Sequence, residues 1–108
     1  MAKHLVLVLT EPNDGKEAEY HRYYEDQHLD EVLESTGWLN AQRYELVDGV
    51  GQDCPLPYLA IYETDDDDPK SIIPHMNATR EQRAQSDSLN KRTAGVWVFR
   101  ATGREHTK

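Results

Sequence analysis

Three short segments of this sequence are apolar without interruption, and they constrain the fold more than any other feature. Leu5–Leu9 is apolar throughout, and Tyr58–Tyr62 and Val96–Phe99 are nearly so. A strand that faces a core on one side and water on the other alternates apolar and polar residues instead. We therefore predict that these strands are covered on both faces.

The segments between these strands predict two helices. Residues 16–35 contain neither Gly nor Pro, and Gly37 follows as a typical helix C-terminal residue. In the second helical segment, Asp68 is the expected N-cap and Pro69 the first helical residue. Pro74 is expected to divide that segment into a short turn and a helix from about residue 75 to 85.

The remaining segments complete the order strand, helix, strand, strand, helix, strand. We expect strands at Leu5–Leu9, Trp38–Val47, Tyr58–Thr64 and Val96–Ala101, with a loop at Asp48–Pro57. This is the ferredoxin-like order, an α+β protomer with a four-stranded antiparallel sheet and helices on one face. The 108 residues fit a single domain, 1–108.

Two helices cover only one face of such a sheet. The other face would expose a large apolar surface, which a chain of this size avoids. A second copy, packed sheet against sheet about a two-fold axis, is the simplest cover. The sequence therefore predicts a homodimer.

Composition excludes several classes of partner. The formal net charge of −8 disfavours nucleic-acid binding, and no apolar segment reaches the roughly 20 residues of a membrane helix. A single cysteine, Cys54, and a start without a signal-peptide pattern favour the cytoplasm. The charge is uneven, since residues 1–79 carry a net −12 and residues 80–108 a net +4. We interpret the basic C-terminal part as a solvated rim rather than a phosphate-binding patch.

The first helix contains the residues most suited to chemistry. At about 100° per residue, Tyr20, Tyr24, His28 and Val32 form one row on the buried side. His28 is then either a general acid/base in an apolar pocket or a core histidine bonded to a carbonyl or a tyrosine. Imidazole suits acid–base work because its reference pKa of about 6.5 lies near working pH, and burial keeps the ring neutral.

A metal site has weaker support from the sequence than acid–base chemistry at His28. His21 and His28 are seven residues apart, further than a chelating pair on one helix, and neither belongs to an H-E-x-x-H pattern. Adding His4 or His75 leaves a site conceivable, but no spacing requires one. We predict no metal and no cofactor.

Two stretches resemble the dimeric α/β-barrel superfamily, and within it the EthD-like group of small proteins. They are Glu19–Leu29 (EYHRYYEDQHL) and Gly37–Tyr44 (GWLNAQRY). The chain departs from the family pattern at Tyr23, where tryptophan is usual, and at Asp30, where proline usually follows His-Leu. The second departure predicts an unkinked helix at that point.

The resemblance implies two ferredoxin-like protomers that pair their sheets into a barrel, with a ligand between sheet and helices. It implies that His28 is the functional histidine. Activities of the superfamily include cofactor-free oxygenation, lactone isomerisation, polyketide cyclisation and haem breakdown. His4, at the head of the first strand, resembles a pocket histidine of plant polyketide cyclases, although a strand-end histidine has the same pattern.

The leading hypothesis is a cofactor-independent enzyme that acts on a small apolar, phenolic or polyketide-like molecule. His28 would move a proton and Tyr24 would donate a hydrogen bond to the developing oxyanion. The reaction class stays open among cyclase, isomerase, lyase and monooxygenase. The further residues expected to line the substrate site are Tyr20, His75, Tyr44, Trp97 and His4.

Two other classes remain as alternatives to an enzyme. One is a non-catalytic module that binds a hydrophobic metabolite. The other is a haem-handling protein with a histidine as axial ligand.

Overall fold

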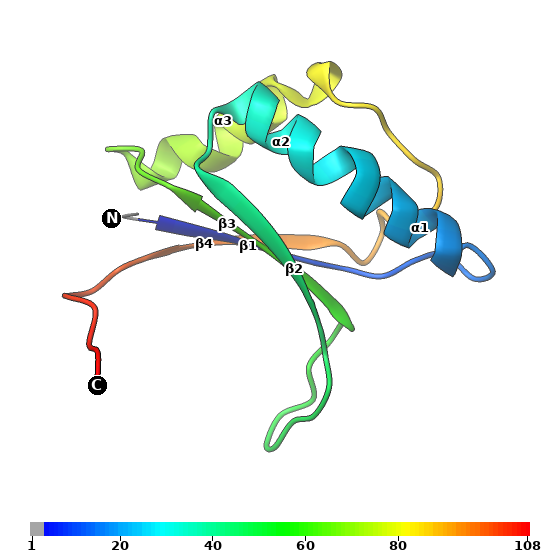
Figure 1. The fold of residues 1–108 in the computed structure, drawn as a ribbon, viewed down its shortest axis with the longest axis horizontal. Coiled ribbons are helices and arrows are strands. Elements are labelled where there is room, and N and C mark those ends of the chain that lie inside the picture. Colours follow the sequence, from blue (N-terminus) through cyan, green and yellow to red (C-terminus); the bar gives the residue numbers. More distant parts are fainter. Residues whose placement is uncertain (1–3) are drawn as a thin grey trace.

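The computed structural model describes residues 4–108 and has an α+β fold built on one antiparallel sheet (Figure 1). Its strands are β1 (His4–Thr10), β2 (Asn40–Glu45), β3 (Tyr58–Thr64) and β4 (Gly95–Arg100). They lie in the order β2-β3-β1-β4, so the two ends of the chain supply the paired strands β1 and β4. The predicted four-stranded sheet with helices on one face is confirmed, and the order is compatible with a ferredoxin-like fold.

The first helical run follows the predicted bounds closely but is not one regular α-helix. It consists of α1 (Glu17–Tyr23), a π-helical turn η1 (Tyr24–His28) and α2 (Leu29–Thr36). In η1 the Leu29 N–H donates to the Tyr24 carbonyl, five residues back rather than four. Asp30 itself lies in the α-helix α2, and the departure from α-helical geometry lies just before it, in η1, which holds one residue more than an α-helical turn.

The predicted helix boundaries at Gly37 and Asp68 are confirmed. Gly37 adopts a left-handed conformation with φ of 78°, and its N–H donates to the Leu33 carbonyl at 2.9 Å. The Asp68 carboxylate accepts a hydrogen bond from the Lys70 N–H at 3.0 Å, with Pro69 at the first helical position. Both features close a helix end that would otherwise leave backbone groups unsatisfied.

The second helical region differs from the expected helix at residues 75–85. It contains a 3-10 turn η2 (Pro69–Ser71), α3 (Ile72–Ala78) and a second 3-10 turn η3 (Arg80–Gln82). Pro74 lies in the first turn of α3 and does not divide the segment, since an N–H there needs no intrahelical acceptor. Residues 83–94 then run as an irregular segment back to β4.

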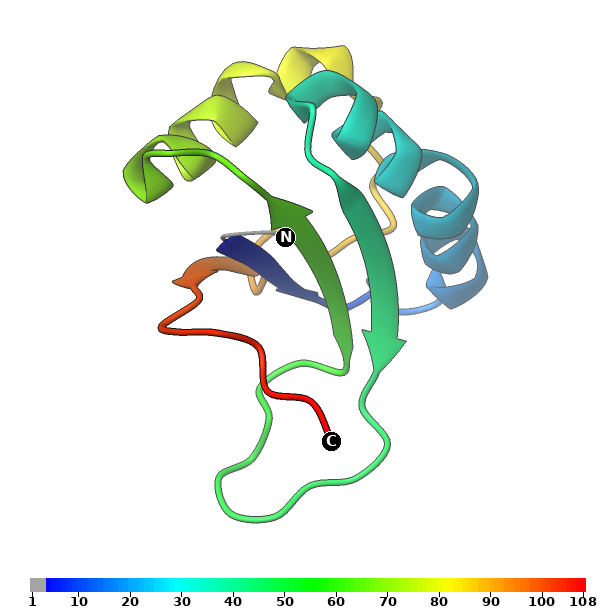
Figure 2. The ribbon, with the colours of Figure 1, turned by 60° about the vertical axis from the view of Figure 1, so that its left-hand side comes forward.

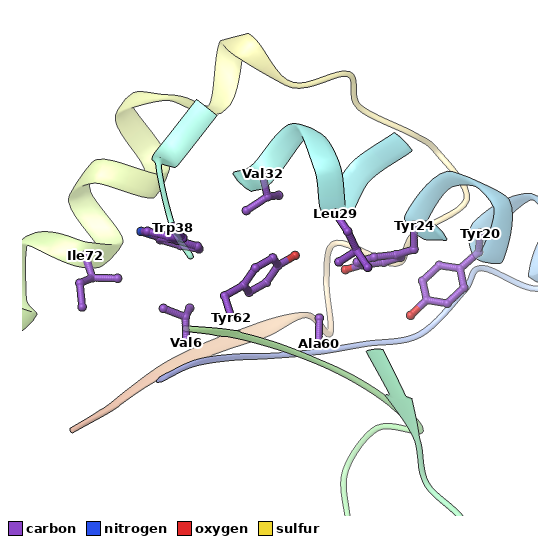
Figure 3. Close-up of a cluster of buried hydrophobic side chains, with 9 residues drawn as sticks. All are labelled: Val6, Tyr20, Tyr24, Leu29, Val32, Trp38, Ala60, Tyr62 and Ile72. Carbon is purple, nitrogen blue, oxygen red and sulfur yellow. The ribbon is translucent and has the colours of Figure 1, made fainter. Parts of the chain in front are cut away.

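The core lies between the sheet and the helices (Figure 3). Even-numbered residues of β1 and β3, such as Val6 and Tyr62, point toward the helices, and side chains of the helices point back toward the sheet. The buried apolar side chains of this cluster are Val6, Tyr20, Tyr24, Leu29, Val32, Trp38, Ala60, Tyr62 and Ile72.

The other face of the sheet is uncovered and apolar. Figure 2 shows all the helices on one side of the sheet, while the loop between β2 and β3 and the C-terminal tail lie on the other side. The exposed fractions of Leu5, Tyr44, Trp97 and Phe99 on this open face range from 37% to 56%. No helix among residues 4–108 has the length and apolar character needed to cross a membrane.

Candidate functional site

A cavity of about 260 Å³ opens between the sheet and the helices, where β1 ends and β4 begins. Its apolar wall includes Val8 and Val96 from the sheet, and Leu89 from the irregular segment. Its polar wall includes His28 and Tyr24 from η1. The cavity lies between the sheet and the helices, where the resemblance implies a ligand.

The π-helical turn determines how His28 meets this cavity. In a regular α-helix the buried row would run from Tyr20 through Tyr24 to His28. The extra residue in η1 moves Leu29 into that row, and Leu29 is buried while His28 is half-buried. His28 thus leaves the deep core and stands at the cavity wall, next to Tyr23.

Tyr23 fixes the orientation of the His28 ring. The two rings stack, with centroids 4.8 Å apart, and the Tyr23 hydroxyl lies 2.9 Å from His28 Nδ1. The same hydroxyl donates to the Ala84 carbonyl oxygen at 2.9 Å. A phenol has one proton, and a carbonyl only accepts. The Nδ1 atom must therefore carry the proton of the neutral ring, which leaves the lone pair on Nε2.

Burial and charge keep His28 neutral. Desolvation, followed by the nearby Arg83 guanidinium, lowers the pKa of His28 to about 4. Near pH 7 the ring is therefore unprotonated and able to accept a proton at Nε2. Within residues 4–108, Nδ1 is the only ring nitrogen of His28 that is hydrogen bonded.

Tyr24 supplies a neutral hydrogen-bond donor at the same cavity. Burial raises the pKa of Tyr24 to about 12, so its phenol keeps its proton. The Thr10 hydroxyl donates to the Tyr24 oxygen over a long 3.4 Å contact and also bonds the Tyr20 hydroxyl. Because the one hydroxyl proton of Thr10 is donated to Tyr24, Tyr20 must be the donor in its bond to Thr10. The hydroxyl proton of Tyr24 is then free to bond another acceptor. The Tyr24 ring stands edge-on to His28, with centroids 5.0 Å apart.

A largely enclosed arginine side chain from β2 supports this helical turn on the side of the sheet. The Arg43 side chain is 9% exposed and lies over the rings of Tyr20, Tyr24 and Tyr58, 4.7 to 5.6 Å from their centroids. It donates to His21 Nδ1 at 3.1 Å and forms an ion pair with Glu25 at 2.9 Å. His21 is thus an acceptor for Arg43 and does not line the cavity with His28.

The structure brings His28 and Tyr24 together at the cavity and places the other predicted site residues outside it. Tyr20 is fully buried in the core, where its ring packs edge-on against Tyr24 with centroids 5.2 Å apart and its hydroxyl bonds Thr10. Tyr44 and Trp97 lie on the open face of the sheet, where the Tyr44 hydroxyl donates to the Gln42 side chain at 3.1 Å. None of the three is among the residues that line the cavity.

The two remaining predicted histidines also lie outside the cavity. His75 is exposed, and its Nε2 donates to the Thr36 carbonyl at 2.9 Å, which connects α3 to the end of α2. His4 is 3% exposed at the start of β1, and its ring nitrogens have no hydrogen-bond partner within residues 4–108. His4 and Thr10 are the two ends of β1, six residue steps or about 20 Å apart, and Thr10 is the one that lines the cavity.

Several polar and charged cavity residues were not predicted as site residues from the sequence. Tyr23 was noted only as a departure from the family pattern, and Arg80, Arg83 and Lys91 belong to the C-terminal basic excess that we interpreted as a solvated rim. The positive net charge of residues 80–108 was the sequence signal that could have indicated these basic cavity residues. Nothing in the spacing indicated the π-helical turn that pairs Tyr23 with His28.

Residues 4–108 contain no group of three or more His, Cys, Asp or Glu side chains arranged to hold a metal ion. In comparisons with protein families, with curated proteins and with solved structures, nothing matches this chain significantly.

Proposed function

We propose that the chain is a cofactor-independent acid–base enzyme that acts on a small, mostly apolar phenolic or polyketide-like molecule in this cavity. The observation that carries the proposal is the hydrogen-bond chain from His28 through Tyr23 to Ala84. It gives His28 one defined tautomer, with the basic Nε2 free of any partner among the described residues. A bond to a tyrosine is also expected of a core histidine, and it is the position of His28 in the cavity wall that favours the enzyme.

In this mechanism Nε2 of His28 removes a proton from a carbon next to a carbonyl, or from a phenol. Tyr24 donates a hydrogen bond to the oxygen on which negative charge develops, which costs little because its phenol is already neutral and oriented by Thr10. Because the pKa of His28 is low, the imidazolium returns its proton readily. Cyclisation, isomerisation, cleavage and cofactor-free oxygenation all fit this proton transfer.

We also propose that two copies pair through the open faces of their sheets, as the resemblance to the dimeric α/β barrels implies. The apolar side chains of the open face support this pairing, and so does the loop between β2 and β3, which extends past the sheet on the same side (Figure 2). In that loop Val47 is 87% exposed and Val50 is fully exposed. Such apolar residues are costly in water and suited to contact a second copy.

The test of the enzyme proposal is a thermal-shift screen against phenols, lactones and polyketide-like aromatics, with each stabilising compound then assayed for conversion. We expect His28→Ala to bind the same compounds and to lose about a hundredfold or more in conversion rate. Tyr23→Phe removes the bridge to Ala84 and should reduce conversion about tenfold while binding is retained. Tyr44→Phe, on the open face, is the matched control and should convert at the normal rate.

Equal conversion by the wild type and His28→Ala would refute the role of His28. Compounds that bind both proteins and are left unchanged would instead support a module that only binds a hydrophobic metabolite.

A further inference from the structure

The charge around the cavity is opposite in sign to that of the chain. Three of its lining residues are basic, namely Arg80, Arg83 and Lys91, and none is acidic. The whole chain carries a formal net charge of −8. A positively charged cavity in an acidic protein concentrates anions locally and disfavours cations.

Arg83 is the most informative of these cations because it is buried. Arg83 is 8% exposed, and its guanidinium donates to the hydroxyls of Ser35 and Thr79, both at 2.9 Å. It also donates to the Met76 carbonyl at 2.8 Å. These bonds hold the group rigidly, but all three acceptors are neutral. A buried charge is normally paired with an opposite charge.

No carboxylate of the described residues forms an ion pair with the basic residues of the cavity. Glu31 acts on Arg83 only through space, and its carboxylate accepts hydrogen bonds from the Ala84 N–H at 2.9 Å and from Gln27 at 3.5 Å. The Arg80 guanidinium donates to the neutral Gln85 side chain at 3.4 Å, and no acidic side chain of residues 4–108 is hydrogen bonded to it. Neither Arg83 nor Lys91 forms an ion pair within residues 4–108.

We propose that this cavity binds an aromatic compound that carries a carboxylate, and that Arg83, Arg80 and Lys91 bind that carboxylate. The proposal rests on the proposed function for the choice of cavity and for the aromatic class, and it adds the charge of the substrate. Arg83 supplies a preoriented buried cation, and the two exposed residues at the rim attract and complete the anion site. The apolar side chains of Val8, Leu89 and Val96 contact the ring.

Three isosteric probes test the charge preference: para-hydroxybenzoate, para-hydroxybenzamide and para-hydroxybenzamidine. They share one phenol ring and differ in a substituent that is anionic, neutral or cationic. We expect titration calorimetry at low salt to show the benzoate binding about tenfold or more tighter than the amide, the range for a hydrogen bond to a charged group. The amidine should bind more weakly than the amide. Added salt should weaken the binding of the benzoate alone.

Variants at the rim keep the test independent of folding, because Arg83 also has structural hydrogen bonds. We expect Lys91→Gln and Arg80→Gln each to weaken benzoate binding about threefold and to leave amide binding unchanged. Lys70→Gln removes the same charge outside the cavity and should change neither affinity. Equal binding of benzoate and amide, no binding of either, or an equal loss of both in the rim variants would overturn the proposal.

The two proposals fail separately. His28→Ala should retain the preference for the benzoate, because it leaves all three cations in place. Loss of conversion in His28→Ala together with no charge preference would leave the enzyme proposal standing and refute the carboxylate site. A clear preference for the benzoate without any conversion would support the carboxylate site and refute the enzyme proposal.

Discussion

At the scale of single residues, one hydrogen bond decides which atom of His28 is available for chemistry. The Tyr23 hydroxyl gives its proton to the Ala84 carbonyl and therefore accepts from Nδ1 of His28. In the proposed mechanism the base is then Nε2. A phenylalanine at position 23 would keep the stacked ring, but without the hydroxyl it would no longer hold the proton of His28 on Nδ1. Tyr23 therefore acts as a positioning residue for His28.

The lowered pKa of His28 makes a prediction about stability and pH. Folding favours the neutral ring, because the pKa of His28 falls from its ordinary 6.5 to about 4. The contribution of His28 to stability is present above the ordinary pKa and is lost as the pH falls toward the folded-state value. We expect His28→Gln to lose less stability than the wild type on acidification, by about 1 kcal/mol for each pH unit between about pH 6 and pH 4.

Chemical denaturation at a series of pH values measures this difference. His75→Gln, which removes an exposed histidine, should follow the wild type over that range. Parallel curves for the wild type and His28→Gln would show that His28 keeps an ordinary pKa in the folded state.

At the scale of elements, the π-helical turn and β2 are coupled through Arg43. One guanidinium contacts the rings of Tyr20, Tyr24 and Tyr58, which come from α1, η1 and β3. Because the Arg43 side chain is 9% exposed, these contacts are poorly screened by water, and cation–π contacts are strongest there. The partner Glu25 is 56% exposed, so the ion pair itself adds little.

This coupling predicts that Arg43→Gln is strongly destabilising. We expect a loss of about 3 kcal/mol in the free energy of unfolding, from the cation–π contacts and the hydrogen bond to His21 together. Urea denaturation measures it, with Arg22→Gln on the exposed side of α1 as the control, expected to change stability by less than about 0.5 kcal/mol. A loss for Arg43→Gln as small as that of the control would mean that β2 does not stabilise the helical turn.

At the scale of the whole molecule, the open face of the sheet is the dominant feature. One face of the sheet is covered by the helices, and the other presents apolar side chains from all four strands, including Leu5, Tyr44, Leu59 and Trp97. A stable interface buries about 1,200 to 2,000 Å² in total, and a four-stranded face is broad enough to supply it. The cavity with His28 lies on the opposite face, so pairing leaves it accessible.

The proposed pairing predicts a dimer in solution. Light scattering after gel filtration should give twice the mass of one 12.5 kDa chain at micromolar concentration. Phe99→Glu, which places a charge on the open face, should give a monomer. Gln82→Glu adds the same charge on the exposed η3 turn and should stay dimeric. A monomeric wild type would refute the pairing and would leave the open face without an assigned partner.

Much of the fold was predictable because it depends on local signals. The uninterrupted apolar segments located β1, β3 and β4, and Gly37 and Asp68 marked helix boundaries through their own backbone geometry and side-chain hydrogen bonds. The apolar character of both sheet faces also indicated that the helices leave one face uncovered. These features need only neighbours in the sequence, so the sequence alone determined them.

The site was decided by contacts between distant segments. The helical period placed His28 in the row of Tyr24, but the helix contains a π-helical turn there, and the hydrogen-bond partner of His28 is Tyr23, which is bonded in turn to Ala84. The basic C-terminal residues were visible as a net charge, yet only the tertiary structure placed Arg83 beneath the helices and beside His28. Helical period and net charge are properties of one segment, whereas a tautomer and an unpaired buried charge depend on which segments meet.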